Sequence, residues 1–144
     1  MKTLYTAEAT ARGGRQGSAR TSDGNLEVEI VPPAELGGPG GSGTNPEQLF
    51  AAGYAACFSN ALRSAATRQE RAEVVEGATV TAHVDIGALG KGRFGLAVKL
   101  ETKLPKLPQE EAEQLVALAH ERCPYSNATR GNIAVELAVE GVVQ

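Results

Sequence analysis

The sequence predicts an α+β fold built on a largely antiparallel sheet. Two observations support this class. Segments in which apolar and polar residues alternate come in pairs separated by turn signals, which is the pattern of β-hairpins. Two segments with helical character separate these pairs, so the order of elements is β-β-α-β-β-α-β, with hairpins rather than regular crossovers.

Five segments are predicted to be strands. Residues 2–12 and 25–31 form the first pair, with a turn at residues 23–25. Residues 77–87 and 93–103 alternate on both sides of a glycine-containing turn, and Pro105 and Pro108 are expected to end this hairpin. Residues 132–142 alternate again and give the last strand.

The first predicted helix is the clearest element. Asn45 is a favourable N-cap, Pro46 suits the first helical position, and Gln48 completes a capping-box pattern. The helix is expected to run to about Arg68. Its first half, residues 49–58, is apolar on every side, which predicts a buried helix. The glycine-rich stretch at residues 37–43 is expected to be a flexible loop that leads into it.

The second predicted helix runs from about Pro108 to Arg122, with apolar residues at helical spacing. Cys123 ends it and Pro124 stops it, and residues 127–130 are expected to form a turn with side-chain caps. The other cysteine, Cys57, lies in the middle of the first helix.

Length and charge exclude several classes of function. A chain of 144 residues predicts a single domain over residues 1–144. The net charge is −3 and the basic residues are scattered, which argues against nucleic acid as a partner. No apolar run reaches the roughly 18 residues of a membrane span, and no signal peptide is recognisable. We therefore expect a cytoplasmic protein with no membrane partner.

The two cysteines are either buried apolar residues or reactive thiols, because the cytoplasm keeps thiols reduced. A metal site is not expected, since His120 and Cys123 have no matching second pair of ligands. Burial raises the pKa of a thiol, and a helix C-terminus disfavours a thiolate. A reactive cysteine would therefore need a cation, for which Arg12 and Arg15 in a predicted loop are candidates.

Two motifs resemble those of a known family. The segment TNPEQLFAAGYAACF, from Thr44 to Phe58, is similar to the first active-site motif of the organic hydroperoxide resistance branch of the OsmC-like family. The segment CPYSNATRGN, from Cys123 to Asn132, is similar to the second. The sequences GGR at residues 13–15 and ELGG at residues 35–38 also match, so the resemblance runs nearly end to end.

The resemblance implies an OsmC-like fold with two central helices, in an intertwined homodimer. It also implies a peroxidase without cofactor that reduces organic hydroperoxides under oxidative stress. Cys57 would be the peroxidatic cysteine and Cys123 the resolving cysteine. Arg15 would stabilise the thiolate, and Glu47 would hold Arg15. The reductant would be an external lipoyl dithiol, either dihydrolipoamide or a lipoylated protein.

One expectation comes from spacing alone. Glu47 and Cys57 are ten residues apart on one helix, roughly 15 Å of rise, and point in different directions. Within a single chain, one arginine side chain would not easily contact both Glu47 and Cys57. We therefore expect Arg15 and Glu47 to serve the Cys57 of the other subunit.

Other interpretations remain open from the sequence. Tyr125 and Phe94 could line an apolar pocket for the organic tail of the peroxide, or belong to the core. Arg12 and Arg20 are expected to be solvated surface charges. A general OsmC-type peroxidase with broader substrates, a non-catalytic module that binds an apolar ligand, and a redox sensor all fit the cysteine pair.

Overall fold

The structure is a computed structural model that describes residues 1–143 and divides into two compact units. The first unit comprises Met1–Leu49, and the second begins at Phe50. The helix α1, Pro46–Arg68, starts in the first unit and continues into the second. The helices of the chain and its two sheets give the predicted α+β class.

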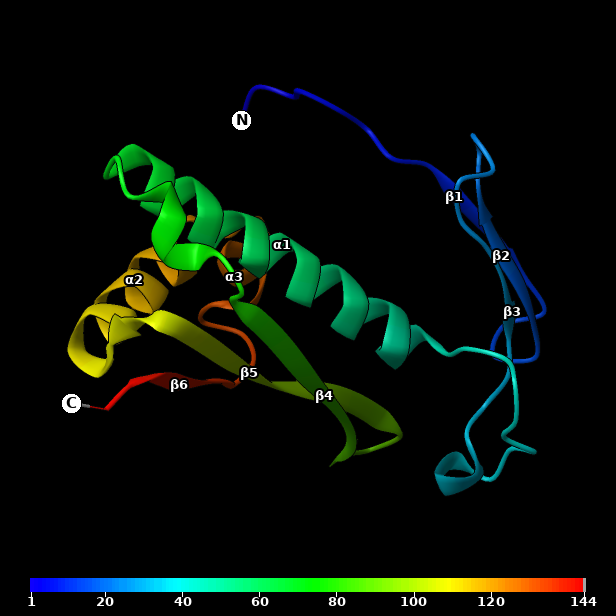
Figure 1. The fold of residues 1–144 in the computed structure, drawn as a ribbon. Helices are drawn as coiled ribbons and strands as arrows, with labels where there is room; N and C mark the ends of the chain where they lie inside the picture. Colours follow the sequence, from blue (N-terminus) through cyan, green and yellow to red (C-terminus); the bar gives the residue numbers. More distant parts are fainter. Residues whose placement is uncertain (144) are drawn as a thin grey trace. The chain divides into compact units, whose positions relative to one another are not determined.

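The first unit contains a three-stranded antiparallel sheet in the order β1-β2-β3 (Figure 1). The strands are β1, Ala9–Arg12; β2, Gly17–Thr21; and β3, Glu27–Ile30. The predicted strand over residues 2–12 is thus wrong for residues 2–8, and β2 was not predicted. The turn that precedes β2 requires glycine, because Gly13 and Gly14 have φ angles of 78° and 59°.

The start of α1 is capped as predicted. The Asn45 side-chain oxygen accepts a hydrogen bond from the Gln48 backbone N–H at 2.8 Å. The Gln48 side chain accepts instead from the Thr44 hydroxyl at 2.8 Å, so Asn45 supplies the N-cap half of a capping box. The loop before it contains a short 3₁₀ helix, η1, Ala34–Leu36.

The second unit contains the sheet β4-β5-β6, formed by β4, Thr79–Gly90; β5, Arg93–Pro108; and β6, Val135–Val142. The predicted hairpin of β4 and β5 is confirmed, with Lys91 and Gly92 at its turn. The prolines do not end β5 at residue 103, because pairing with β6 resumes at Pro108. β6 runs parallel to β5, so the expectation of hairpins alone is wrong for this strand.

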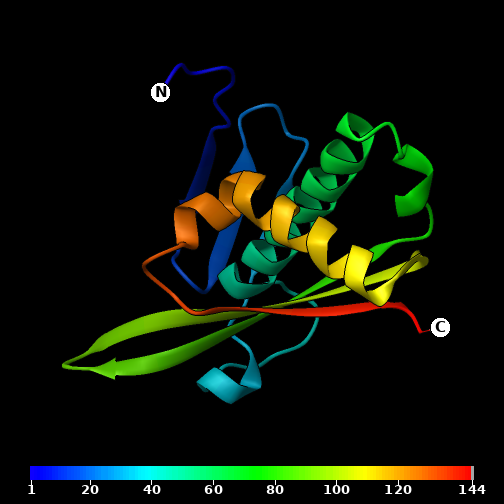
Figure 2. The ribbon, with the colours of Figure 1, turned by 90° about the vertical axis from the view of Figure 1, so that its left-hand side faces the viewer.

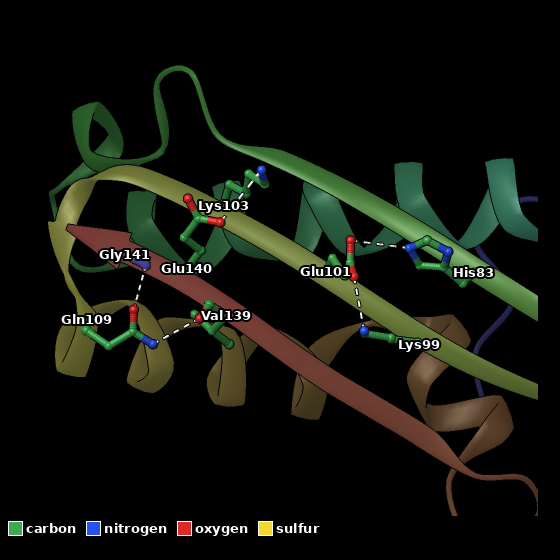
Figure 3. A network of polar contacts seen from close by, with 8 residues as sticks. All are labelled: His83, Lys99, Glu101, Lys103, Gln109, Val139, Glu140 and Gly141. Carbon is green, nitrogen blue, oxygen red and sulfur yellow. Dashed lines mark hydrogen bonds and ion pairs between the residues drawn. The ribbon is translucent and has the colours of Figure 1, made fainter. Parts of the chain in front are cut away.

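The side chain of Gln109 closes a gap in the β5–β6 ladder (Figure 3). Regular pairing shifts register between Lys103 and Pro108. There the Gln109 side chain donates to the Val139 carbonyl at 2.9 Å and accepts from the Gly141 N–H at 2.7 Å. Figure 3 also shows that Glu101 lies close to Lys99 of the same strand and to His83 of β4, and that Lys103 of β5 lies close to Glu140 of β6. The edge of the sheet therefore keeps its hydrogen bonds where the backbone pairing fails.

Three helices accompany this sheet: the greater part of α1; α2, Gln109–Arg122; and α3, Pro124–Thr129. Figure 2 shows α1 and α2 on the same side of the sheet. A 3₁₀ helix, η2, Ala72–Val75, follows α1. The short helix α3 replaces the predicted turn at residues 127–130, and it begins at Pro124, which suits a first helical position. The connection through α2 and α3 carries the chain back, so that β6 can run parallel to β5.

The core lies between these helices and the sheet. The buried apolar side chains come mainly from α1, β5 and α2, and include Phe58 and Leu62 of α1, Leu100 and Leu104 of β5, and Val116 of α2. The first half of α1 is not buried on every side as predicted, because Ala52 and Ala56 are exposed. Their small side chains leave a stripe of the helix uncovered in this chain.

Candidate active site

The structure brings the two cysteines together. Cys57, in the middle of α1, is half-buried, and Cys123, between α2 and α3, is fully buried. Their sulfur atoms lie 3.5 Å apart. A disulfide bond is close to 2.05 Å long, so a shift of roughly 1.5 Å would join them. Both thiols are free in this structure.

The second unit does not activate Cys57 by itself. Burial raises the pKa of the Cys57 thiol, and the neighbouring Cys123 raises it further. The backbone N–H of Tyr125 acts in the opposite direction, because a hydrogen bond to sulfur stabilises the thiolate. Burial is the largest of these effects. A thiolate at Cys57 therefore needs a positive charge from another part of the protein.

Arg15 and Glu47 form a paired fork within the first unit. The two guanidinium nitrogens of Arg15 donate to the two carboxylate oxygens of Glu47 at 2.9 Å and 2.7 Å. Glu47 is mostly covered, with 12% of its side chain exposed, whereas Arg15 is 41% exposed. This bidentate geometry orients the plane of the guanidinium and leaves its remaining N–H donors for another acceptor.

The pair makes stability depend on pH. The hydrogen bonds from Arg15 hold the pKa of Glu47 below its usual value, so the folded state favours the ionised carboxyl. The stabilisation is present above the unfolded pKa of about 4.3 and is lost as the pH falls through the lower folded pKa. We expect Glu47→Gln to lower the free energy of unfolding by a near-constant amount above about pH 5 and by less towards pH 3. Urea denaturation at fixed protein concentration measures this, and a difference that grows on acidification would contradict it.

An open groove of about 900 Å³ lies beside the cysteine region of the second unit. Tyr125 and Phe94, the two aromatic residues proposed from the sequence for an apolar pocket, both line it. Tyr125 links the groove to the sulfur pair, because its backbone N–H contacts Cys57 while its ring lines the groove. The other lining residues are mainly apolar: Phe50, Leu89, Gly95, Leu96, Ala128, Thr129, Asn132, Ile133 and Ala134.

The ring of Tyr125 is seated on α1. It contacts the rings of Phe50 and Tyr54, with centroid separations of 6.1 Å and 5.6 Å. A Cβ atom at Gly53 would lie 2.7 Å from the Tyr125 hydroxyl oxygen, which is too close for a real contact. Glycine at this position therefore lets the ring lie against the helix.

The sequence interpretation missed a group of hydroxyls behind the sulfur atoms. Tyr54, Ser126 and Thr129 are buried and hydrogen-bonded to one another, and His120 joins them through Ser126. Their spacing is a signal that could have found them. Tyr54 precedes Cys57 by three residues on α1, and Ser126 follows Cys123 by three residues, so each shares a helical face with a cysteine.

Residues 1–143 contain no group of three or more His, Cys, Asp or Glu side chains that could hold a metal ion. Within the same residues, no helix is both long enough and apolar enough to cross a bilayer.

Comparison with known proteins identifies the family to which this chain belongs. The model of a family described as OsmC-like protein matches residues 38–138. This chain is a member of the OsmC-like family, in the branch of the organic hydroperoxide resistance proteins.

Individual relatives support this placement. The chain is 50% identical over 138 residues to the organic hydroperoxide resistance protein of Xanthomonas axonopodis pv. citri, covering 96% of each chain. The crystal structure of such a protein from Legionella pneumophila has a TM-score of 0.91 at 50% identity, over 96% of this chain and 99% of that one. A putative one from Vibrio cholerae, with captopril bound in one of its active sites, has a TM-score of 0.91 at 50% identity, over 99% and 96% of the two chains.

Proposed function

We propose that the protein is a thiol peroxidase that reduces organic hydroperoxides to alcohols and contributes to resistance against oxidative stress. The observation that carries the proposal is the 3.5 Å contact between the sulfur atoms of Cys57 and Cys123. The names of the relatives agree with this substrate class. A half-buried thiol beside a buried thiol is an arrangement that can alternate between dithiol and disulfide.

The chemistry has two steps. In the first, the Cys57 thiolate attacks the outer oxygen of the hydroperoxide; the O–O bond breaks, and the alkoxide leaves and takes a proton to become the alcohol. Cys57 is then a sulfenic acid. In the second, the Cys123 sulfur attacks the Cys57 sulfur; the S–O bond breaks, and the hydroxyl leaves with the thiol proton as water. The product is the Cys57–Cys123 disulfide.

Arg15 and Glu47 are proposed to activate Cys57. A guanidinium near the sulfur would lower the pKa that burial raises, and its free N–H donors would stabilise the charge on the departing alkoxide. Glu47 would hold the guanidinium in the required orientation through the bidentate pair.

The site is proposed to be completed in a homodimer, with Arg15 and Glu47 serving the Cys57 of the partner subunit. Several exposed apolar surfaces support an assembly. Phe94 and Leu89, near the tip of the β4–β5 hairpin, are 68% and 61% exposed, and Ala52 and Ala56 leave part of α1 uncovered. The relative from Vibrio cholerae has more than one active site, which agrees with one site per subunit.

The groove beside Tyr125 is proposed to hold the organic part of the substrate. Its largely apolar lining suits an alkyl or aryl chain and offers little to hydrogen peroxide. Electrons would come from a lipoyl dithiol, which reduces the disulfide by thiol–disulfide exchange and itself becomes a cyclic disulfide. The peroxidase would need no bound cofactor and would work in the reducing cytoplasm.

A steady-state assay tests this proposal. We expect turnover of tert-butyl and cumene hydroperoxide with dihydrolipoamide, at rates at least about tenfold above that for hydrogen peroxide, because only the organic substrates use the apolar groove. Equal rates would favour a general OsmC-type peroxidase. A single oxidation without sustained turnover would favour a redox sensor, and no reaction with any peroxide would contradict the proposal.

A further inference from the structure

A buried chain of hydrogen bonds joins three helices next to the sulfur pair. The Tyr54 hydroxyl of α1 lies 2.9 Å from the Ser126 hydroxyl and 3.1 Å from the Thr129 hydroxyl, both on α3. The Nδ1 atom of His120, on α2, lies 2.9 Å from the same Ser126 hydroxyl. Tyr54 and Ser126 are fully buried and Thr129 is 6% exposed, so water cannot readily replace these partners.

The contacts fix the direction of every bond in the chain. The Thr129 hydroxyl donates its hydrogen to the Ser126 carbonyl oxygen at 3.2 Å, so it must accept from Tyr54. Tyr54 has one hydroxyl hydrogen, which goes to Thr129, so Ser126 must donate to Tyr54. Ser126 in turn must accept from His120, which places the ring hydrogen of a neutral His120 on Nδ1.

The position of His120 is consistent with this direction. Burial lowers the pKa of the ring, and the positive charge of Arg130 lowers it further, so the ring is neutral at pH 7. Arg130 also donates to the His120 backbone carbonyl at 2.5 Å and to the Asn127 side chain at 2.6 Å. The bond to His120 ties the C-terminal end of α3 to the last turn of α2, so the two helices are joined across Cys123.

The hydroxyl bridge runs parallel to the sulfur contact. Cys57 and Tyr54 are three residues apart on α1, and Cys123 and Ser126 are three residues apart across the start of α3. The two contacts therefore connect the same two segments, roughly one helical turn apart. Apolar packing alone would tolerate small sliding of α3 along α1, whereas a directed chain of hydrogen bonds has one geometry.

We propose that Tyr54, Ser126, Thr129 and His120 are positioning residues for the second step of the reaction, which hold Cys123 within reach of the sulfenic acid on Cys57. This inference rests on the proposed function. In that step a sulfur–sulfur bond forms while the S–O bond of Cys57 breaks and water leaves. The four residues act without contacting either sulfur atom. They fix the position of α3 and, with it, the position of Cys123.

The two steps can be timed separately in single-turnover experiments. The first is the loss of the Cys57 thiol on mixing with tert-butyl hydroperoxide. The second is the disappearance of sulfenic acid trapped by dimedone, read by mass spectrometry. We expect Tyr54→Phe and Ser126→Ala to leave the first rate within about twofold of wild type and to slow the second by about tenfold or more, as for a displacement near 1 Å. The Thr129→Ser variant keeps every hydroxyl of the hydrogen-bond chain, so its Cys57 sulfenic acid should disappear at nearly the wild-type rate.

Each outcome bears on one of the two proposals. If wild-type Cys57 forms no sulfenic acid, the peroxidase function itself fails, and this inference with it. If wild type forms the disulfide and both hydroxyl-deleting variants do so equally fast, the positioning role is refuted while the peroxidase function stands. Equal slowing of both steps would also refute the positioning role, because the hydrogen bonds would then affect the attack of Cys57 on the peroxide as much as the formation of the disulfide.

A measurement on the unmodified protein guards against variants that fail to fold. The ¹⁵N chemical shifts of the His120 ring at pH 7 distinguish its two neutral forms. We expect the hydrogen on Nδ1; a hydrogen on Nε2 would break the directed chain and overturn the inference.

Discussion

Replacing Cys57 by serine is expected to reduce the consumption of organic hydroperoxide by about 10³-fold or more. A serine hydroxyl lies in the same place but stays protonated and is a far weaker nucleophile than a thiolate. The initial rate with tert-butyl hydroperoxide and dihydrolipoamide measures this. Retention of more than about a tenth of the wild-type rate would mean that another group attacks the peroxide.

Cys123→Ser is the matched control, because it removes the other sulfur of the same contact. This variant should still reduce one equivalent of hydroperoxide at close to the wild-type rate. It should then accumulate Cys57 sulfenic acid and oxidise further to the sulfinic acid with excess peroxide. A Cys123→Ser variant that is as inactive as Cys57→Ser in the first turnover would show that Cys123 has a role in peroxide attack.

Replacing Arg15 by alanine is expected to slow the oxidation of Cys57 by about 10²-fold, the usual effect of losing a charged donor at a reacting centre. Arg15→Lys keeps the charge but cannot form the two bonds to Glu47, so it should recover only part of the rate. The pH dependence of Cys57 alkylation gives the pKa of the thiol, and so shows whether Arg15 acts by stabilising the thiolate. Arg15→Ala should raise the thiol pKa, whereas an unchanged pKa would contradict activation by this arginine.

Mixed dimers test whether Arg15 acts across the subunit interface. Cys57→Ser and Arg15→Ala chains, each nearly inactive alone, are combined and the mixed dimer is isolated with two affinity tags. If Arg15 serves the partner, the mixed dimer contains one complete site and should recover about half of the wild-type rate. If Arg15 serves its own chain, neither site is complete and the mixed dimer stays inactive.

Local signals in the sequence were sufficient for much of the fold. The limits of α1 follow from Asn45, Pro46 and the change to polar residues near Arg68, all of which act within one or two turns. The β4–β5 hairpin follows in the same way from the alternation of its residues and the glycines of its turn. Such elements depend on neighbours in the chain and can be read from them.

Elements that depend on distant contacts were missed. β2 has only five residues and little apolar character, and its pairing with β1 and β3 makes it a strand. The direction of β6 is set by where α2 and α3 return the chain, which no local pattern contains. The burial of α1 was overestimated because Ala52 and Ala56 look apolar in sequence but lie exposed in this chain.

The residues of the candidate site also fall into two groups, those indicated by sequence motifs and those that only the fold brings together. Arg15, Glu47, Cys57 and Cys123 were selected from motifs, and the structure adds that they form two contacts, one between the charged residues and one between the sulfurs. Tyr54 and Ser126 each lie three residues from a cysteine, but this spacing places them only on the same helical face and does not show that their hydroxyls and that of Thr129 meet. Only the fold brings their oxygens together.

The most direct test of the peroxidase account is a titration of the fully reduced protein with one equivalent of cumene hydroperoxide. The account predicts one equivalent of the alcohol and the loss of both thiols. Peptide mass spectrometry should then show a disulfide between Cys57 and Cys123. Recovery of both free thiols together with intact hydroperoxide, or alcohol formation that leaves Cys57 unmodified, would contradict it.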